Sequence, residues 1–172
     1  LLEKIGREAE HARCGKPARI IAKLNALNEP QVMRALYRAS QAGVEIDLIV
    51  RGACSLRPGV PNVSETIRVR SVVGRFLEHS RVYWFANDGE PELYCSSADW
   101  LERNLLRRIE TCFPILDPAL AQRVYEEELA NYLADNTQSW LLQSDGSYVR
   151  TSPSDDEMPF SAQNALVARL CR

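Results

Sequence analysis

The pattern of hydrophobic and polar positions predicts strands and helices in alternation near the start of the chain. Residues 1–13 have the spacing of a short helix, and residues 14–17 form a turn rich in Gly and Pro that closes it. Residues 18–24 predict a strand. The mostly apolar run at 44–50 predicts a second strand, central in its sheet and buried on both faces.

A helix is expected between these two strands. Asn28 is placed to cap it, Pro30 lies in its first turn, and Gly43 ends it. Strand, helix and strand in this order indicate a βαβ unit, in which ligands bind where the carboxyl ends of the strands meet the loops. Arg51 follows the second strand directly and is therefore expected at that rim.

The rest of the chain continues the alternation of strands and helices. The Asn-Asp-Gly sequence at 87–89 predicts a hairpin turn. Asp117 and Pro118 begin the most regular helix, whose acidic run at 126–128 is interpreted as a solvated face. The other expected elements are strands at 66–72, 81–85, 92–95, 107–115, 140–142 and 148–149, helices at 100–106 and 161–170, and loops at 52–65 and 151–158.

Composition indicates one globular domain. The chain has 172 residues, of which 45% are hydrophobic and 26% charged, enough for a core. The net charge of −2 argues against a nucleic-acid partner, so any affinity for anions must be local. No apolar run is long enough to be a transmembrane segment, and no signal peptide opens the chain. The start at Leu1, inside a helical pattern, suggests a fragment of a longer protein.

The cysteines predict neither a disulfide framework nor a metal site. There are five of them, an odd number, and they lie far apart without a CxxC pair. Zinc sites need clustered ligands, and secreted disulfide frameworks need dense, even cysteines. We therefore expect reduced thiols and no metal-ligating residue in this chain.

Arginines gather around one of the two histidines. His79 stands before a strand-like run at 82–85, and six arginines against two acidic residues lie between positions 51 and 81. A guanidinium group is a planar fork of donors that binds phosphate at two points and stays charged. The pattern predicts a phosphate site. It is also compatible with a structural histidine and arginines scattered over a solvated face.

Four longer motifs resemble the polyphosphate kinase family. They are KLNAL at 23–27, DLIVRGACSLRPG at 47–59, IRVRSVVGRFLEHSRVYWF at 67–85 and LYCSSADWLERNLLRRIE at 93–110. The match is to the last domain of the long, histidine-phosphorylated type. The resemblance implies an α/β fold, a phospholipase D-like mixed β-sheet flanked by helices. It also implies that residues 1–172 form a single domain, the C-terminal (second) of two such halves in a larger polypeptide.

The resemblance implies an activity for the longer protein. That activity is reversible transfer of the ATP terminal phosphate to inorganic polyphosphate through a phosphohistidine, with ATP/ADP as substrate and Mg²⁺. The phosphohistidine belongs to an HxK motif that this chain lacks, so it and the Mg²⁺ ligands are expected in the preceding domain, and the fragment alone is expected to be inactive. The implied partners are the preceding domains and further copies of the chain. A cytoplasmic location follows, with peripheral membrane association of the full-length protein left open.

The resemblance implies two site residues, each in a motif that matches without gaps. His79 falls on the catalytic histidine that contacts the nucleotide phosphates, and Arg51 falls on an ATP-binding arginine. Arg81 is two residues past His79 and, on a strand, shares its face, so it could reach the same phosphates. Ser96, Ser97 and Arg108 are further candidates for phosphate contacts.

Chemistry suggests how His79 works and what the serines otherwise do. The leaving group would be ADP, whose terminal phosphate needs little protonation, so we expect His79 to act mainly as a hydrogen-bond donor. The residues at 96–99 could instead cap the helix expected at Trp100.

Two other function classes remain open at this point. The domain could be a non-catalytic module that binds nucleotide or polyphosphate. It could also be a phospholipase D-like phosphodiesterase that acts as a dimer, each chain supplying one histidine. Against the phosphodiesterase, the chain lacks HxK followed by a correctly spaced Asp. Hydrolysis of a phosphodiester by a dimer would separate this class from ATP-dependent transfer.

Overall fold

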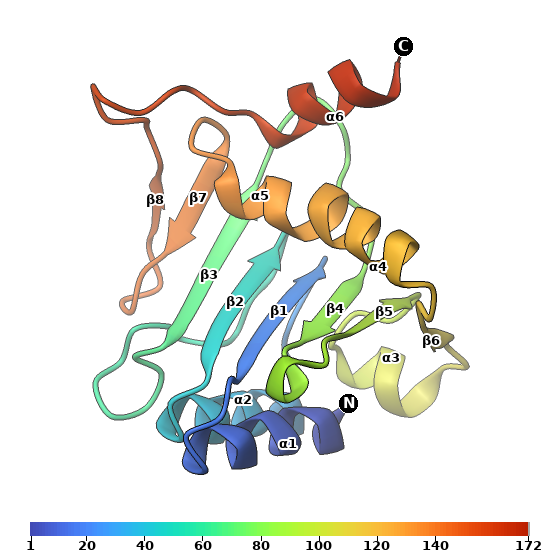
Figure 1. Ribbon diagram of the computed structural model, residues 1–172. Helices are drawn as coiled ribbons and strands as arrows, with labels where there is room; N and C mark the ends of the chain where they lie inside the picture. The colour runs from blue at the N-terminus through green and yellow to red at the C-terminus, as the bar shows by residue number, and fades with distance from the viewer. Residues whose placement is uncertain (172) are drawn as a thin grey trace.

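The computed structural model describes residues 1–171, which form one mixed eight-stranded sheet with helices on both faces (Figure 1). The strand order is β6-β5-β4-β1-β2-β3-β7-β8. The three central strands β1, β2 and β3 are parallel, and every other pairing is antiparallel. The strands are β1 (Arg19–Leu24), β2 (Glu45–Val50), β3 (Ile67–Val72), β4 (Val82–Phe85), β5 (Glu92–Ser96), β6 (Cys112–Pro114), β7 (Ser139–Leu142) and β8 (Tyr148–Arg150).

Helices cover the two faces in separate groups. In Figure 1, α1 and α2 lie side by side, and the helix labelled α4 and α5 crosses the strands near the arrowheads of β1 and β2. The helical elements are α1 (Leu2–Arg13), α2 (Pro30–Gln41), η1 (Asn87–Gly89), α3 (Glu102–Arg107), α4 (Pro118–Tyr125), η2 (Glu126–Ala130), α5 (Asn131–Ala134) and α6 (Ala162–Leu170). The turn η2 has π geometry and joins α4 to α5 without a break.

Side chains of β1 alternate between two cores. Ile20, Ala22 and Leu24 belong to the larger cluster, which also holds buried residues of α1 and α2. Ile21 belongs to the smaller cluster, together with buried residues of η2, α5 and α6. In β2, five consecutive residues are buried, as predicted for a central strand.

The parallel order of β1 and β2 confirms the predicted βαβ unit. Parallel strands bring their carboxyl ends to one edge of the sheet. Leu24 therefore pairs with Val50, and the loops that follow both strands start side by side. The segment between β3 and β4 leaves from the same edge, because β3 runs parallel to β2.

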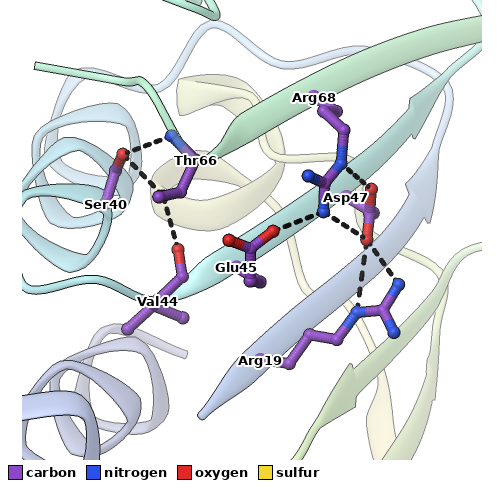
Figure 2. A network of polar contacts seen from close by, with 7 residues as sticks. All are labelled: Arg19, Ser40, Val44, Glu45, Asp47, Thr66 and Arg68. Carbon is purple, nitrogen blue, oxygen red and sulfur yellow. Dashed lines mark hydrogen bonds and ion pairs between the residues drawn. The ribbon is translucent and has the colours of Figure 1, made fainter. Parts of the chain in front are cut away.

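A network of charged side chains lies at the opposite ends of these strands (Figure 2). Asp47 is 4% exposed and accepts hydrogen bonds from Arg19 Nη2 at 2.7 Å and Arg68 Nε at 2.8 Å. Arg68 also pairs with Glu45 at 2.6 Å. Burial raises the pKa of Asp47, but the hydrogen bonds and charges of Arg68 and Arg19 lower it by more. Arg68 is thus engaged at the start of β3 rather than beside His79.

Several local predictions are wrong at the level of single residues. Glu29, not Asn28, caps α2, because its carboxylate accepts the Val32 N–H at 2.6 Å. The strand expected at 107–115 is reduced to the short β6, since Arg107 still belongs to α3. The residues at 96–99 do not cap α3. Its N-cap residue is Leu101, and no side chain makes a capping hydrogen bond there.

The acidic run at 126–128 is a solvated face only in part, because the Glu126 side chain is 46% exposed but that of Glu127 only 15%. The π turn carries it, and all three glutamates are partly buried. Glu128 reaches Lys23 of β1 at 2.8 Å. The other expected elements are present with small shifts at their ends, including the turn at 87–89 between β4 and β5. All five cysteines are free, as predicted.

Candidate functional site

His79 and Arg51 lie together at the edge where the parallel strands end. Arg51 follows β2 directly, and His79 lies in the irregular segment 73–81 between β3 and β4, where its side chain is exposed. Arg51 Nη1 donates to the backbone carbonyl of Glu78 at 2.6 Å. Its own carbonyl accepts from Ser71 Oγ at 2.8 Å. Residues that are far apart in the sequence are thus held at one place.

A chain of hydrogen bonds orients His79. Arg81 Nη1 lies 3.2 Å from His79 Nδ1 and donates to the His79 carbonyl at 2.9 Å. Asp99 in turn holds the other side of the Arg81 guanidinium, with contacts of 3.2 Å to Nε and 3.0 Å to Nη2. The Asp99 carboxylate also accepts the backbone N–H of Asn25 at 2.7 Å. Three segments of the chain are therefore linked to this imidazole by hydrogen bonds.

The negative charge of the buried Asp99 carboxylate is balanced by its hydrogen-bond partners. Burial raises its pKa, but the hydrogen bond and charge of Arg81 and the Asn25 N–H lower it by more. The carboxylate is therefore ionised at neutral pH and holds the Arg81 guanidinium in a fixed plane. A guanidinium group only donates, so the contact with His79 needs an Nδ1 without a proton. In the neutral ring the proton then sits on Nε2.

Arg81 lies beside His79, but not on a shared strand face as expected, because β4 begins only at Val82, and it contacts the imidazole itself. All three of its side-chain nitrogens have protein partners, Asp99 for two and His79 for the third. It is placed to orient His79. A direct phosphate contact from Arg81 stays a prediction, since that contact would compete with the bond to His79.

Ser96 ends β5 and Ser97 follows it, and both are bonded to the residues just before β6. Ser96 Oγ donates to the Thr111 carbonyl at 3.0 Å, and Ser97 Oγ donates to Glu110 and accepts the Thr111 N–H at 3.0 Å. Ser96 and the exposed Arg108 line a cavity of about 350 Å³ with aromatic walls. Phosphate contacts from Ser96, Ser97 and Arg108 stay predictions.

Three residues of the site were not found from the sequence as site residues. Lys23 pairs with Glu78 and Glu128 beneath the His79 segment, and the side chain of Asn25 borders a cavity of about 10 Å³ beside Arg51. Asp99 was seen only as a small polar residue near a helix start. The signals available were a single lysine in an apolar strand and the KLNAL motif itself.

Two further observations concern metals and membranes. Within residues 1–171, no group of three or more His, Cys, Asp or Glu side chains could hold a metal ion. The helices of this same part of the chain are too short or too polar for any of them to cross a bilayer.

Similar proteins agree on one family. The family model described as polyphosphate kinase C-terminal domain 2 matches residues 1–163. A polyphosphate kinase of Xylella fastidiosa is 68% identical over 170 residues, which are 99% of this chain and 24% of the relative. A polyphosphate kinase of Pseudomonas aeruginosa is 59% identical over 170 residues, with the same coverage of both chains. The chain thus spans about a quarter of the length of these relatives.

Solved structures confirm the fold. The crystal structure of polyphosphate kinase from Porphyromonas gingivalis matches with a TM-score of 0.93 and 43% identity, over 98% of this chain and 26% of that one. Nuc from Salmonella typhimurium, a phospholipase D family member, matches with a TM-score of 0.53 and 16% identity, over 83% of this chain and 89% of that one. The predicted phospholipase D-like sheet is therefore confirmed. The chain belongs to the polyphosphate kinase family, as its C-terminal domain 2.

Proposed function

We propose that this domain supplies half of a phosphoryl-transfer site, in which Arg51 and His79 bind the phosphates of ATP and polyphosphate. The full-length protein would move the terminal phosphate of ATP to inorganic polyphosphate, and the reverse. The observation that supports this most directly is the meeting of an exposed imidazole and a guanidinium at one sheet edge, joined through Glu78. A preceding domain would supply the other half, with the phosphohistidine.

The geometry suits the chemistry of phosphoryl transfer. Such transfer depends on positioning and on neutralising negative charge spread over phosphate oxygens. Only one nitrogen of the Arg51 guanidinium has a hydrogen-bond partner among residues 1–171, so the fork keeps donors for phosphate. His79 would present its Nε2–H to a phosphate oxygen. Both groups donate, as an anionic ligand requires.

Magnesium, which the family implies, does not fit the donors of this half-site. The nearby carboxylates of Asp99 and Glu78 are engaged by Arg81 and Lys23. The groups that remain at the sheet edge are cationic or neutral donors, which do not ligate Mg²⁺. No step proposed for this domain is routed through the metal.

The test uses the full-length polypeptide that carries this domain. Arg51→Ala and His79→Ala are each expected to lower kcat/KM for ATP in polyphosphate synthesis by about 100-fold, the cost of removing one donor to a transferring group. Arg38→Ala, an exposed arginine of α2, is the matched control and should retain activity.

Two outcomes would contradict the proposal. If both site variants kept full transfer activity, the phosphate-binding roles would be wrong. If the full-length protein hydrolysed a phosphodiester such as bis(p-nitrophenyl) phosphate and failed to use ATP, the phosphodiesterase class would replace phosphoryl transfer.

A further inference from the structure

The segment that bears His79 has little apolar anchoring. Its hydrophobic side chains point outward, and Val73, Phe76 and Leu77 are 59%, 50% and 77% exposed. The segment has no helix or strand of its own between β3 and β4. The polar contacts beneath it therefore decide its conformation, since apolar burial contributes little here.

Lys23 lies at the centre of these contacts. It is 2% exposed, on the face of β1 that η2 and α5 cover. Its Nζ is 2.8 Å from a Glu78 oxygen, 2.8 Å from a Glu128 oxygen, and 3.3 Å from the centre of the Tyr132 ring. A lysine is fully buried only when its charge is matched, and here two carboxylates and an aromatic face match it.

Glu78 connects Lys23 to both proposed phosphate-binding residues. Its carboxylate holds Lys23, its carbonyl accepts from Arg51, and His79 is the next residue in the chain. Burial raises the pKa of Glu78, but the hydrogen bond and charge of Lys23 lower it by more, so the carboxylate is ionised. The orientation of this one residue thus depends on the ammonium group below it and on Gln163 Nε2 of α6, which donates to the Glu78 carboxylate at 2.5 Å.

Two further side chains support the same segment. The Gln163 side chain of α6 accepts the Phe76 N–H at 2.9 Å and donates to the Phe76 carbonyl at 2.8 Å. Ser80 donates to Glu128, the second carboxylate on Lys23. The charged group of Lys23, Glu78 and Glu128 therefore contacts the segment on both sides of His79, at Glu78 and at Ser80.

We propose that Lys23 is a positioning residue of the phosphate site. It holds Glu78 so that the Glu78 carbonyl meets Arg51. Without the ammonium group, Glu78 and Glu128 would repel each other, and Glu78 would turn toward water. Arg51 would then lose its carbonyl partner. This inference rests on the proposed function of Arg51 and His79.

The test is a double-mutant cycle in the full-length protein. Lys23→Met, Arg51→Ala and the double variant are assayed for kcat and KM for ATP, at a temperature where circular dichroism shows all of them folded. Lys23→Met is expected to lower kcat/KM about 30-fold in the native background, as a displaced binding group does. In the Arg51→Ala background, Lys23→Met should lower kcat/KM by less than about threefold, because the two residues act on one contact. Lys16→Met, a surface lysine paired with Asp88, is the control and should be unchanged.

Additive effects, or native kcat/KM in Lys23→Met, would overturn the inference, because a merely structural lysine shows no coupling to Arg51. If Lys23→Met does not fold, Glu78→Gln replaces it, since it keeps the backbone carbonyl and removes the charge that Lys23 holds. The same coupling to Arg51 is expected, and its absence would overturn the inference. If Arg51→Ala itself leaves transfer intact, the proposed function fails and this inference fails with it.

Discussion

The Arg81 guanidinium lies 3.2 Å from Nδ1 of His79, so the ring receives a hydrogen bond on that nitrogen and offers its proton from Nε2. A Gln side chain places its amide N–H₂ near the position of Nε2, whereas Asn places it near Nδ1. We therefore expect His79→Gln to keep kcat within about tenfold of the native enzyme, and His79→Asn and His79→Ala to lose about 100-fold. Steady-state assays of the full-length protein measure this order. Equal loss in all three variants would favour proton transfer by His79 over hydrogen-bond donation.

The Asp99–Arg81 pair should matter for both stability and activity. The two side chains are 9% and 13% exposed, and removing one partner of a buried pair leaves the other unmatched. Asp99→Asn is expected to lower the unfolding free energy by about 3 kcal/mol and to reduce activity as Arg81 releases His79. Urea unfolding followed by tryptophan fluorescence measures the first effect. Asp88→Asn, in an exposed pair with Lys16, should change it by less than about 1 kcal/mol, and an equal loss there would refute the argument.

Gly74 should tolerate no side chain. A Cβ at this position would overlap the side-chain oxygens of Gln138 and Gln163. Gln163 cannot withdraw without breaking its two bonds to Phe76. Gly74→Ala is therefore expected to speed amide hydrogen exchange at residues 75–80 and to lower kcat, while exchange in α2 stays native. Gly6→Ala, where a Cβ meets open space, is the control. Native exchange at 75–80 in Gly74→Ala would show that Gln163 does not hold the segment.

Low pH should weaken the ion pairs that join α1 to β5. Glu92 accepts hydrogen bonds from Arg7 and Lys4, each at 2.7 Å. The bond from Arg7 lowers the pKa of Glu92 most, burial opposes it, and Lys4 adds to it, so that the pKa falls from 4.5 to about 2. A lowered carboxyl pKa stabilises the folded state above the unfolded value and loses this effect as pH falls through the folded value. The Tm difference between native protein and Glu92→Gln should thus be largest near neutral pH and shrink from pH 4.5 to about 2. A constant difference across that range would mean that the charge of Glu92 does not contribute.

The sequence predicted the parts of the molecule that depend on local patterns. Arg51 and His79 follow β2 and β3, and parallel strands end at one edge, so their proximity follows from the order of elements. Asp99 could not be assigned in this way, because its partners Arg81 and Asn25 come from other segments and meet it only in the folded sheet. The acidic run at 126–128 was misread for a similar reason. Glu128 of this run contacts Lys23 of β1, which is far from it in the sequence, so no local pattern shows that pairing.

That π turn has a consequence for how this stretch can change in length. Deleting one residue from Glu126–Ala130 would restore regular α-helical bonding, so the helix itself would be no less stable. The residues beyond the deletion would keep nearly the same direction around the helix axis, because a π turn carries one more residue than an α turn over roughly the same rotation. Tyr132 would stay beside the Lys23 ammonium, and the carbonyl of Leu133 would stay beside Arg70, which it binds at 2.6 Å. A single-codon deletion here would thus remove the π bulge and leave the helix packed on the sheet that it covers.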